Sequence, residues 1–427
     1  MTQNQNQHYD VIVVGSGPGG ATVARDLARQ GKRVLILEWG NGKALTGTLQ
    51  HMAQIAAIPG RGAFINRDMS LLVQGVTTGG SSAINFATAM PPPPALFARY
   101  GIELQPALAE LKQELHFAPL PDHLIGPMAT RIMQSASALG LGWQKLDKLI
   151  RADQCRTGCW RCLYGCPFGA KWTARDFIDD AVKAGTQLIT SAKVSRVLHH
   201  DGRASGVLYQ HQGITKEARA NTVILAGGGI ASPRLLAASG IASSSTKHFS
   251  DPVIAVMGSV DDMDGGAEVP MAAGLHLDSD GITLSDLTLP TAMYRAFATQ
   301  VGRLDRWFAH SRTLSIMVKI RDELGGNIGP YWINKGLAPT DKLKFKQGIT
   351  LARDILQHTQ AKSIFQTWHF AAHPGGSVRI GDGVDNNLQT KIHQLYVCDA
   401  SVIPEAWGLP PSLTIMCLAK RLAGHLS

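Results

Sequence analysis

The stretch Asp10-Val-Ile-Val-Val-Gly-Ser-Gly-Pro-Gly-Gly20 decides the fold, because an apolar run of strand length passes directly into a glycine-rich turn. Residues 21–30 follow with helical periodicity, and Val34-Leu-Ile-Leu37 is a second strand-like run that ends at Glu38. A strand, a G-x-G-x-x-G turn, a helix and an acid at the end of the next strand form the fingerprint of a dinucleotide-binding βαβ unit. The sequence therefore predicts such a unit at residues 10–38.

Each part of this fingerprint has a physical reason. We expect Gly15 to permit the tight turn, Gly17 to let the backbone approach a pyrophosphate, and Gly20 to let the helix pack on the strand. The amino terminus of the helix then faces the phosphates, and Glu38 can accept a hydrogen bond from a ribose hydroxyl.

Four cysteines lie close together with the spacing C-x3-C-x2-C-x3-C-P, namely Cys155, Cys159, Cys162 and Cys166, the last followed by Pro167. The second half of this run resembles the end of a bacterial ferredoxin motif, whose thiolates hold an iron–sulfur cluster. The first gap is three residues instead of two, and the sequence contains no second set of cysteines. We predict a single 4Fe-4S cluster, and the alternatives are a structural zinc ion, two disulfides or an empty site.

Composition limits the function classes. A chain of 427 residues is long enough for two domains or one two-lobed unit. The net charge of +9 is spread along the chain without a polybasic block, so we do not expect a nucleic-acid-binding protein. No run of 18 apolar residues predicts a transmembrane helix, and the polar start predicts no signal peptide. Few, clustered cysteines indicate metal use in a reducing compartment, so we expect a cytoplasmic protein.

Further along the chain, residues 194–207 predict a hairpin and residues 222–229 a buried strand that ends in glycines. Ser232-Pro233 predicts the start of a helix over residues 234–239, since proline suits the first turn. Residues 243–345 have no clear pattern. Because glycine-turn strands occur at both ends of the chain, we expect the nucleotide-binding domain to be built from discontinuous segments around an inserted lobe.

Five segments, taken in order, resemble the glucose–methanol–choline (GMC) oxidoreductases, which are FAD enzymes. They are Gly15 to Gly20 with Glu38-Trp-Gly40, Gly79-Gly-Ser-Ser-Ala-Ile-Asn85, Gly228 to Ile241, His373-Pro-Gly-Gly-Ser-Val-Arg-Ile-Gly381, and Val397-Cys-Asp-Ala-Ser-Val-Ile-Pro404. The cysteine segment, with Gly165-Cys-Pro-Phe-Gly-Ala-Lys171, is similar to a subgroup that includes the long-chain alcohol oxidases.

The resemblance implies which residues bind FAD. In chain order they are Gly15, Gly17, Gly20, Glu38, Gly79, Gly80, Ser81, Asn85, Val194, Asp399 and Ala400. Glu38 would bind the adenosine ribose and the Val194 backbone the adenine, while Asn85 would lie against the isoalloxazine. Asp399 and Ala400 would lie near its pyrimidine edge. No histidine occurs between Gly75 and Met90, where the family attaches a covalent flavin, so the resemblance implies non-covalent FAD.

The resemblance also places a catalytic histidine at His373. An imidazole with an ordinary pKa near 6.5 can accept the hydroxyl proton of an alcohol while hydride leaves for flavin N5. The family's second active-site residue, a histidine or asparagine, falls at Pro410, which offers no side-chain donor or acceptor. His373 therefore works alone, or His369 or a residue from the unpatterned lobe replaces the missing partner.

The expected fold class is α/β, with a Rossmann-like FAD-binding domain and an inserted α+β substrate domain that carries an antiparallel sheet. The expected segments are residues 1–100, 181–242 and 376–427 for the FAD-binding domain, 101–180 for a cap with the cysteines, and 243–375 for the substrate domain.

The expected function is an FAD-dependent dehydrogenase that oxidises a small-molecule alcohol. Its electrons would pass through the 4Fe-4S cluster to an external acceptor such as a quinone, a ferredoxin or a cytochrome. Two alternatives stay open. One is a flavin-dependent lyase or reductase with a structural metal knot, and the other is an FAD/iron–sulfur electron-transfer subunit.

Overall fold

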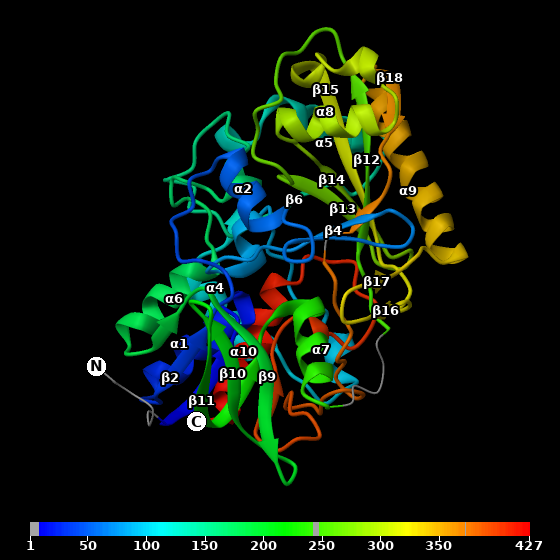
Figure 1. Cartoon of the computed structure of the whole chain (residues 1–427). Coiled ribbons are helices and arrows are strands. Elements are labelled where there is room, and N and C mark those ends of the chain that lie inside the picture. Colours follow the sequence, from blue (N-terminus) through cyan, green and yellow to red (C-terminus); the bar gives the residue numbers. More distant parts are fainter. Residues whose placement is uncertain (1–7, 242–246, 372) are drawn as a thin grey trace.

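Two β-sheets organise the chain, and each is the centre of one lobe (Figure 1). This computed structural model describes residues 8–241, 247–371 and 373–427. The lower lobe in Figure 1 contains the glycine-rich turn of the sequence fingerprint, and the upper lobe contains most of the segment without a clear sequence pattern.

The lower lobe is built on a seven-stranded sheet with the order β8-β2-β1-β11-β10-β9, in which β20 also pairs with β11. The strands are β1 (His8–Val14), β2 (Val34–Leu37), β8 (Gln187–Ile189), β9 (Ala192–His200), β10 (Arg203–His211), β11 (Ile214–Leu225) and β20 (Leu395–Val397). β1 pairs in parallel with β2 and β11, whereas β9, β10 and β11 form an antiparallel meander. The predicted hairpin is the β9–β10 pair, and the predicted buried strand is the end of β11.

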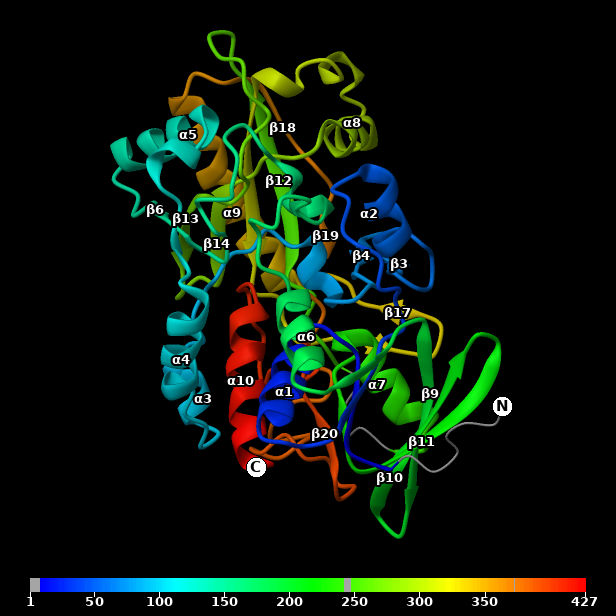
Figure 2. The same cartoon turned by 90° about the vertical axis from the view of Figure 1, so that its left-hand side faces the viewer.

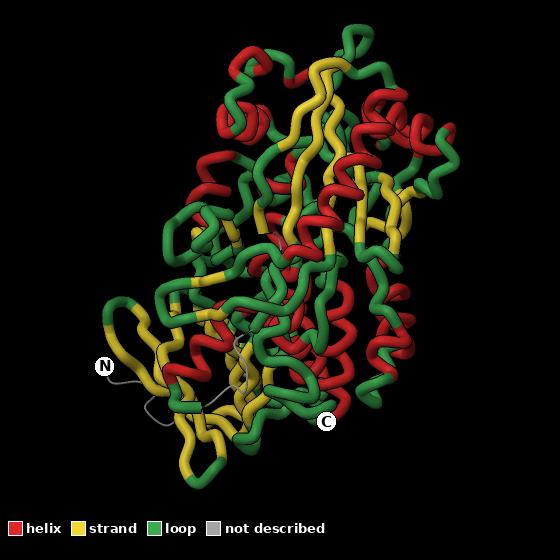
Figure 3. Tube along the Cα trace, turned by 90° about the vertical axis from the view of Figure 1, so that its right-hand side faces the viewer, coloured by secondary structure: helices red, strands yellow, loops and turns green. Residues whose placement is uncertain are grey.

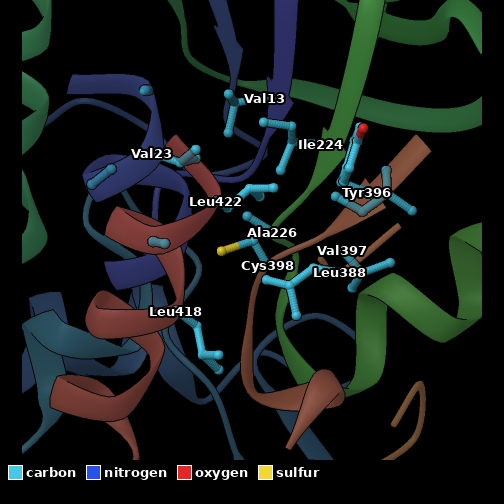
Figure 4. Close-up of a cluster of buried hydrophobic side chains, with 14 of the residues drawn as sticks. Val13, Val23, Ile224, Ala226, Leu388, Tyr396, Val397, Cys398, Leu418 and Leu422 are labelled. Atoms are coloured by element: carbon cyan, nitrogen blue, oxygen red, sulfur yellow. The ribbon is translucent and has the colours of Figure 1, made fainter. Parts of the chain in front are cut away.

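Helices cover both faces of this sheet. α1 (Pro18–Arg29) contacts α6 (Ala174–Lys183) and α10 (Ser412–His425), and α7 (Gly228–Ala238) contacts β9. Figure 4 shows the core on the α1 and α10 side, where side chains of both helices meet residues of the sheet around Cys398. Since these residues come from both ends of the chain, the lobe is discontinuous in sequence, as predicted.

The upper lobe is built on a nine-stranded sheet with the order β3-β4-β19-β12-β15-β14-β13-β6, in which β18 pairs with β12. The strands are β3 (Ala63–Ile65), β4 (Leu71–Val73), β6 (Gln144–Lys145), β12 (Pro252–Ser259), β13 (Ala273–Leu277), β14 (Ile282–Asp286), β15 (Thr313–Ile320), β18 (Lys362–Gln366) and β19 (Phe370–Ala371). The neighbours are antiparallel except for β19 and β4. The predicted fold class, including the antiparallel sheet, is confirmed.

Both faces of the upper sheet are covered, so the central strands β12 and β15 are buried along their whole length. α5 (Pro127–Ala138) and α9 (Pro339–His358) pack on one face, and α8 (Thr291–Gln300) packs on the other (Figures 2 and 3). Strands buried on both faces carry continuous apolar runs instead of alternation. This is why the sequence of this lobe gave no clear period.

Three strands cross the expected segment boundaries. β3 and β4 lie within residues 1–100 and β6 within residues 101–180, yet all three are hydrogen-bonded into the upper sheet. The segment boundaries at residues 100, 180, 242 and 375 stay a prediction. The upper sheet also contains β3, β4 and β6, which come from the segments before residue 180.

The predicted start of the helix at Ser232-Pro233 is wrong, because α7 begins at Gly228 and contains Pro233 in its interior. Proline has no N–H to donate to the carbonyl four residues earlier, which belongs to Gly229. That carbonyl accepts a hydrogen bond from Ser377 Oγ at 2.8 Å instead. The helix therefore tolerates the proline because another segment satisfies the freed acceptor.

The remaining elements lie outside the two main sheets and the helices described above. They are α2 (Leu49–Ala56), α3 (Pro94–Ala98), α4 (Gln105–Leu115), β5 (Ala118–Pro119), β7 (Asp147–Lys148), β16 (Asn327–Ile328), β17 (Ile333–Asn334) and the 3₁₀ turns η1 (Gly80–Ile84), η2 (Asp122–Leu124), η3 (Arg161–Tyr164), η4 (Leu304–Arg306), η5 (His310–Arg312) and η6 (Ala400–Val402). Among the described helices, none combines the length and the apolar character that crossing a lipid bilayer requires.

Candidate functional site

The turn between β1 and α1 has the geometry of a phosphate-binding loop. Gly15 has φ +102°, and a Cβ there would lie 2.4 Å from the carbonyl oxygen of Ala226. A Cβ on Gly20 would lie 2.1 Å from the Gly15 carbonyl oxygen, so the helix approaches the turn closely. Gly17 faces open space, since a Cβ added there would have no atom within 4 Å, and it begins α1 without a side-chain cap. The free N–H groups of the helix therefore point to a space that can hold an anion.

Glu38 is fixed beside this turn. Its Oε2 accepts hydrogen bonds from Ser16 N at 2.9 Å and Ser16 Oγ at 2.6 Å, and its Oε1 accepts one from Gly40 N at 2.6 Å. Burial raises the pKa of Glu38, and these hydrogen bonds oppose the shift. The carboxyl group is thus held at the end of β2, where a dinucleotide ribose would lie.

The second glycine-rich stretch packs against the first. Gly79 N donates to Ser16 Oγ at 3.0 Å, and a Cβ on Gly80 would lie 3.0 Å from Gly17 Cα. Ser81 Oγ accepts from Gly75 N at 3.0 Å. At the other end of η1, Asn85 Nδ2 donates to Ser412 Oγ at 3.4 Å, at the start of α10. The stretch from Gly79 to Asn85 therefore spans from the dinucleotide turn to the carboxy-terminal helix.

Asp399 joins two further signature segments. Its Oδ2 accepts from Gly228 N at 2.8 Å and from Ser232 Oγ at 2.5 Å, both in α7. The carbonyl oxygen of Ala400 accepts from Gly376 N at 3.0 Å, close after His373. Val194 lies on β9 opposite Tyr209, at the edge of the lower sheet. Direct contacts thus join the dinucleotide turn to Glu38, Gly79 and Gly80, whereas Asn85, Asp399 and Ala400 are held by neighbouring segments and Val194 lies apart.

His373 lies against a buried ion pair. Its Nδ1 is 3.0 Å from Lys319 Nζ and 3.5 Å from Asp251 Oδ2, and Lys319 Nζ is 3.1 Å from the same carboxylate oxygen. The side chain of His373 is 27% exposed, whereas those of Lys319 and Asp251 are 1% and 0% exposed. Desolvation and the Lys319 charge lower the pKa of His373 to about 4, although Asp251 opposes the shift. The ordinary pKa near 6.5 that the sequence suggested is therefore wrong for this environment.

The loop that carries Pro410 is tied to the same group, because Gly408 N donates to Asp251 Oδ1 at 2.8 Å. His369 does not share this environment, since its Nε2 lies 3.0 Å from Asp68 Oδ2. Lys319 and Asp251 belong to the segment without a clear pattern, and they were not among the residues predicted from the sequence. A lysine within the apolar strand Leu314-Ser-Ile-Met-Val-Lys-Ile320 was the available signal.

The four cysteines line one small pocket, which is also lined by Ile150, Arg156, Phe168, Ala170 and Lys171. All six cysteines of the chain are free thiols, so the disulfide alternative is wrong. Within residues 8–241, 247–371 and 373–427, no three histidine, cysteine or acidic side chains are grouped tightly enough to hold a single metal ion. The thiols thus surround a space instead of converging on one point.

Two buried lysines flank this pocket. Lys171 Nζ donates to the carbonyl of Cys162 at 2.7 Å, and it also donates to the carbonyls of Ser82, Ala83 and Asn85 at 3.0, 2.9 and 3.0 Å. Lys148 Nζ donates to Thr88 Oγ1 at 3.2 Å and to the carbonyls of Pro270 and Met271 at 3.0 and 3.1 Å. Burial lowers the pKa of each lysine to about 8. Lys171 connects the cysteine segment directly to η1.

Comparison with known proteins identifies the family. Two models described as GMC oxidoreductase match residues 9–258 and residues 293–419. The chain belongs to the GMC oxidoreductase family. This GMC oxidoreductase is 28% identical over 478 aligned residues to an uncharacterized GMC-type oxidoreductase of Mycobacterium tuberculosis, covering 97% of this chain and 75% of that one.

Other similar proteins include a long-chain-alcohol oxidase of Arabidopsis thaliana, which is 25% identical over 512 residues, covering 97% of this chain and 66% of the plant protein. Among solved structures, the pyridoxine 4-oxidase from Mesorbium loti superposes with a TM-score of 0.77 at 16% identity, covering 98% of this chain and 99% of that chain. This likeness shows that the GMC oxidoreductase has the same fold.

Proposed function

We propose that this GMC oxidoreductase binds FAD without a covalent bond and oxidises the CH–OH group of a small-molecule alcohol. The observation that carries the proposal is the arrangement at the junction of the lobes. There the segments of the dinucleotide turn, η1, α7 and β20 meet, and His373 follows the strand that ends beside them. The names of the relatives, which include alcohol oxidases and a pyridoxine 4-oxidase, support an alcohol as the substrate class.

The residues present fit FAD. The open space before Gly17 at the uncapped start of α1 suits a pyrophosphate, and Glu38 suits a ribose hydroxyl. A second open position lies at Gly228, where φ is +90° and no atom lies within 4 Å of an added Cβ. The residues that would hold the cofactor are those predicted from the sequence, with Val194 at the adenine end. When bound, FAD supplies the acceptor for a hydride.

The protein residues bind and orient the substrate and handle its proton. His373 Nδ1 is occupied by Lys319, so Nε2 is the ring nitrogen left to contact a substrate hydroxyl. Because the pKa of His373 is lowered to about 4, the imidazole is neutral at pH 7. It is therefore uncharged when a substrate hydroxyl binds.

Flavin release and reduction test this proposal. Acid precipitation should release a yellow flavin into the supernatant, and alcohols should bleach the bound flavin under anaerobic conditions. Protein that contains no flavin, or flavin that stays in the pellet, would contradict non-covalent FAD. Flavin that is released but never bleached by any alcohol would favour a lyase, a reductase or an electron-transfer subunit.

We further propose that Cys155, Cys159, Cys162 and Cys166 hold one 4Fe-4S cluster. The ferredoxin-like spacing and the common pocket of the four thiols support a cluster over a single zinc ion, since no three of the described thiols are grouped tightly enough to hold one ion. The two buried ammonium groups of Lys148 and Lys171 favour an anionic occupant. When bound, the cluster supplies one-electron transfer to an external acceptor such as a quinone, a ferredoxin or a cytochrome.

Metal analysis distinguishes the alternatives. Anaerobically purified protein should contain roughly four irons per chain. One zinc without iron would establish the structural-knot alternative, and neither metal would establish an empty thiol pocket. FAD binding does not depend on this outcome.

A further inference from the structure

Lys319, Asp251 and His373 form a connected group of three ionisable side chains. Lys319 Nζ is within hydrogen-bond distance of both Asp251 Oδ2 at 3.1 Å and His373 Nδ1 at 3.0 Å. The backbone of Asp251 is held in the left-handed region at φ +48°, and its N–H donates to Asp322 Oδ1 at 2.9 Å. A strained, doubly anchored aspartate at this position fixes where the lysine amine lies.

The charge of Lys319 and the tautomer of His373 depend on each other. A charged lysine ammonium can only donate, so it requires a lone pair on Nδ1, and the ring hydrogen must then be on Nε2. A neutral lysine amine can accept a hydrogen bond, so Nδ1 can carry the hydrogen and Nε2 is free to accept a proton. The protonation state of the buried Lys319 amine therefore decides whether Nε2 of His373 is a donor or a base.

If His373 accepted the substrate proton and kept both ring hydrogens, it would become a charged imidazolium, which this site disfavours. Imidazolium would lie beside a lysine ammonium in a largely buried position, and these two effects lower the pKa of His373 to about 4. Burial also lowers the pKa of Lys319 from its ordinary value, while Asp251 opposes that shift. The amine therefore loses its proton more readily than an exposed lysine does.

We propose that Lys319, held by Asp251, is the second proton-handling residue of this active site and takes the place of the residue missing at Pro410. The alcohol O–H bond breaks as an Nε2–H bond forms on His373, and the Nδ1–H bond breaks as an N–H bond forms on Lys319. The imidazole is neutral before and after this transfer. The positive charge forms on Nζ beside the Asp251 carboxylate.

This inference rests on the proposed function, because the hydride that leaves the same carbon is accepted by FAD. Lys319 acts through His373 and is a positioning residue in that sense. The loop with Pro410 supports the assignment, since Gly408 donates to the other oxygen of Asp251. A single carboxylate thus orients the lysine and the loop where the second residue is expected.

Several groups on neighbouring elements face this trio or interact with it electrostatically. They are Asp322 at the end of β15, Lys335 paired with Asp322 at 3.0 Å, and His276 on β13. Of these, Lys335 offers a matched control, because it is also a buried lysine beside a buried aspartate. It contacts Asp322 and the carbonyl of Glu323 but neither Lys319 nor His373, so its removal leaves the side-chain contacts of the relay in place while Asp322 still accepts from Asp251 N.

The test compares three variants of the FAD-loaded protein, Lys319→Met, Lys319→Arg and Lys335→Met. Anaerobic stopped-flow experiments measure flavin reduction by an alcohol between pH 6 and pH 10. The unaltered protein should react faster as pH rises through one titration, which is the deprotonation of Lys319. Lys319→Met should lose that titration and react about 10²-fold more slowly, within the usual range for a positioned base.

Lys319→Arg separates a relay from a structural hydrogen bond. Arginine keeps the positive charge and the donors but cannot lose its proton, so it should be as slow as Lys319→Met. Lys335→Met should keep the pH dependence of the unaltered protein, whatever its stability. An arginine variant that restores the rate, or a Lys319→Met variant with an unchanged pH profile, would overturn the proposal.

A measurement without turnover keeps this test separate from that of the proposed function. Nitrogen-15 NMR of histidine-labelled, FAD-loaded protein should show that His373 changes from the Nε2–H to the Nδ1–H tautomer as pH rises. Lys319→Met should abolish that change, and His373→Asn identifies the signal. If no alcohol reduces the flavin, the proposed function fails. The tautomer measurement still shows whether the protonation of Lys319 and the tautomer of His373 are coupled. A tautomer that does not respond to pH or to Lys319→Met refutes the relay.

Discussion

Two pairs of buried lysines differ in what neutralises them. In the upper lobe, Lys319, beside His373, and Lys335, outside that group, each lie within 3.1 Å of a buried carboxylate, Asp251 and Asp322 respectively. Since a buried ammonium without a partner is costly, these carboxylates complete the charge balance of the site from its own side chains.

Beside the cysteine pocket, Lys148 and Lys171 donate to a threonine hydroxyl and to backbone carbonyls, and neither forms an ion pair with a carboxylate in the part of the chain that the structure describes. The charge of Cys162 would favour both ammonium groups, and both lysines oppose the rise in the pKa of this thiol that burial causes. The comparison indicates that carboxylates neutralise the lysines near His373, whereas neutral hydroxyl and carbonyl oxygens solvate the lysines beside the cysteines, which favours the proposed anionic occupant there.

Removing one thiolate should give the largest effect. Cys162→Ser should lower the iron content from roughly four per chain to nearly none, because a cube needs its four thiolates. Cys417→Ser, a buried cysteine on α10, is the matched control and should retain its iron. Iron analysis of both variants with FAD still bound checks this. Equal iron in the two variants would exclude a shared cluster at the four cysteines.

Beside Lys319 and Asp251, His373→Asn should slow flavin reduction by an alcohol about 10²–10⁴-fold, the usual contribution of a positioned base. FAD content should not change, since the predicted cofactor contacts lie on other residues. Rapid-reaction kinetics at fixed pH measures the effect. A variant with an unchanged rate would move the catalytic role away from this residue.

The two lysine pairs should respond differently to charge removal. Lys335→Met leaves Asp322 buried without its partner, which should lower the free energy of unfolding by about 3–5 kcal/mol with or without iron. Lys171→Met should be more costly in iron-loaded than in iron-free protein, because only the loaded site supplies an anionic partner. Urea unfolding of both variants in both metal states measures the difference. An equal cost of Lys171→Met in the two states would contradict the comparison.

Stability should fall in acid because of His373. Its pKa is lowered from 6.5 to about 4 in the folded chain, so the unfolded chain takes up the proton first as pH falls. The folded state should therefore lose about 2–3 kcal/mol between pH 6.5 and pH 4 through this residue. Urea unfolding at pH 7 and pH 4.5 should show a smaller loss for His373→Asn than for the unaltered protein. Identical losses would mean that His373 titrates normally.

The smallest effect is expected at His369. This residue pairs with Asp68 at the edge of the upper lobe, where both side chains are partly exposed. Partly exposed ion pairs contribute about 0–1 kcal/mol, so His369→Ala should change the unfolding free energy and the rate of flavin reduction little. Thermal unfolding and the same kinetic assay test this. A loss comparable with that of His373→Asn would show that His369 belongs to the active site.

The sequence was most informative where short segments set their own conformation. The turn at Gly15, the N-terminus of α1 and the position of Glu38 follow from residues adjacent in the chain. The discontinuous lower lobe was also predictable, because similar glycine turns occur at both ends. The start of α7 was not, since Ser377 from a distant segment satisfies the carbonyl that Pro233 leaves free.

By itself, the sequence determined the family, the dinucleotide turn, the position of the candidate histidine and the grouping of the cysteines. Only the tertiary structure decided what surrounds His373. The antiparallel register of β12 and β15 sets Val253 opposite Lys319, which brings Asp251 beside the lysine, and the segment after β19 adds the histidine. The pKa of an imidazole depends on charges and desolvation within a few ångströms in space. That environment comes from three distant segments, so no local pattern could reveal it.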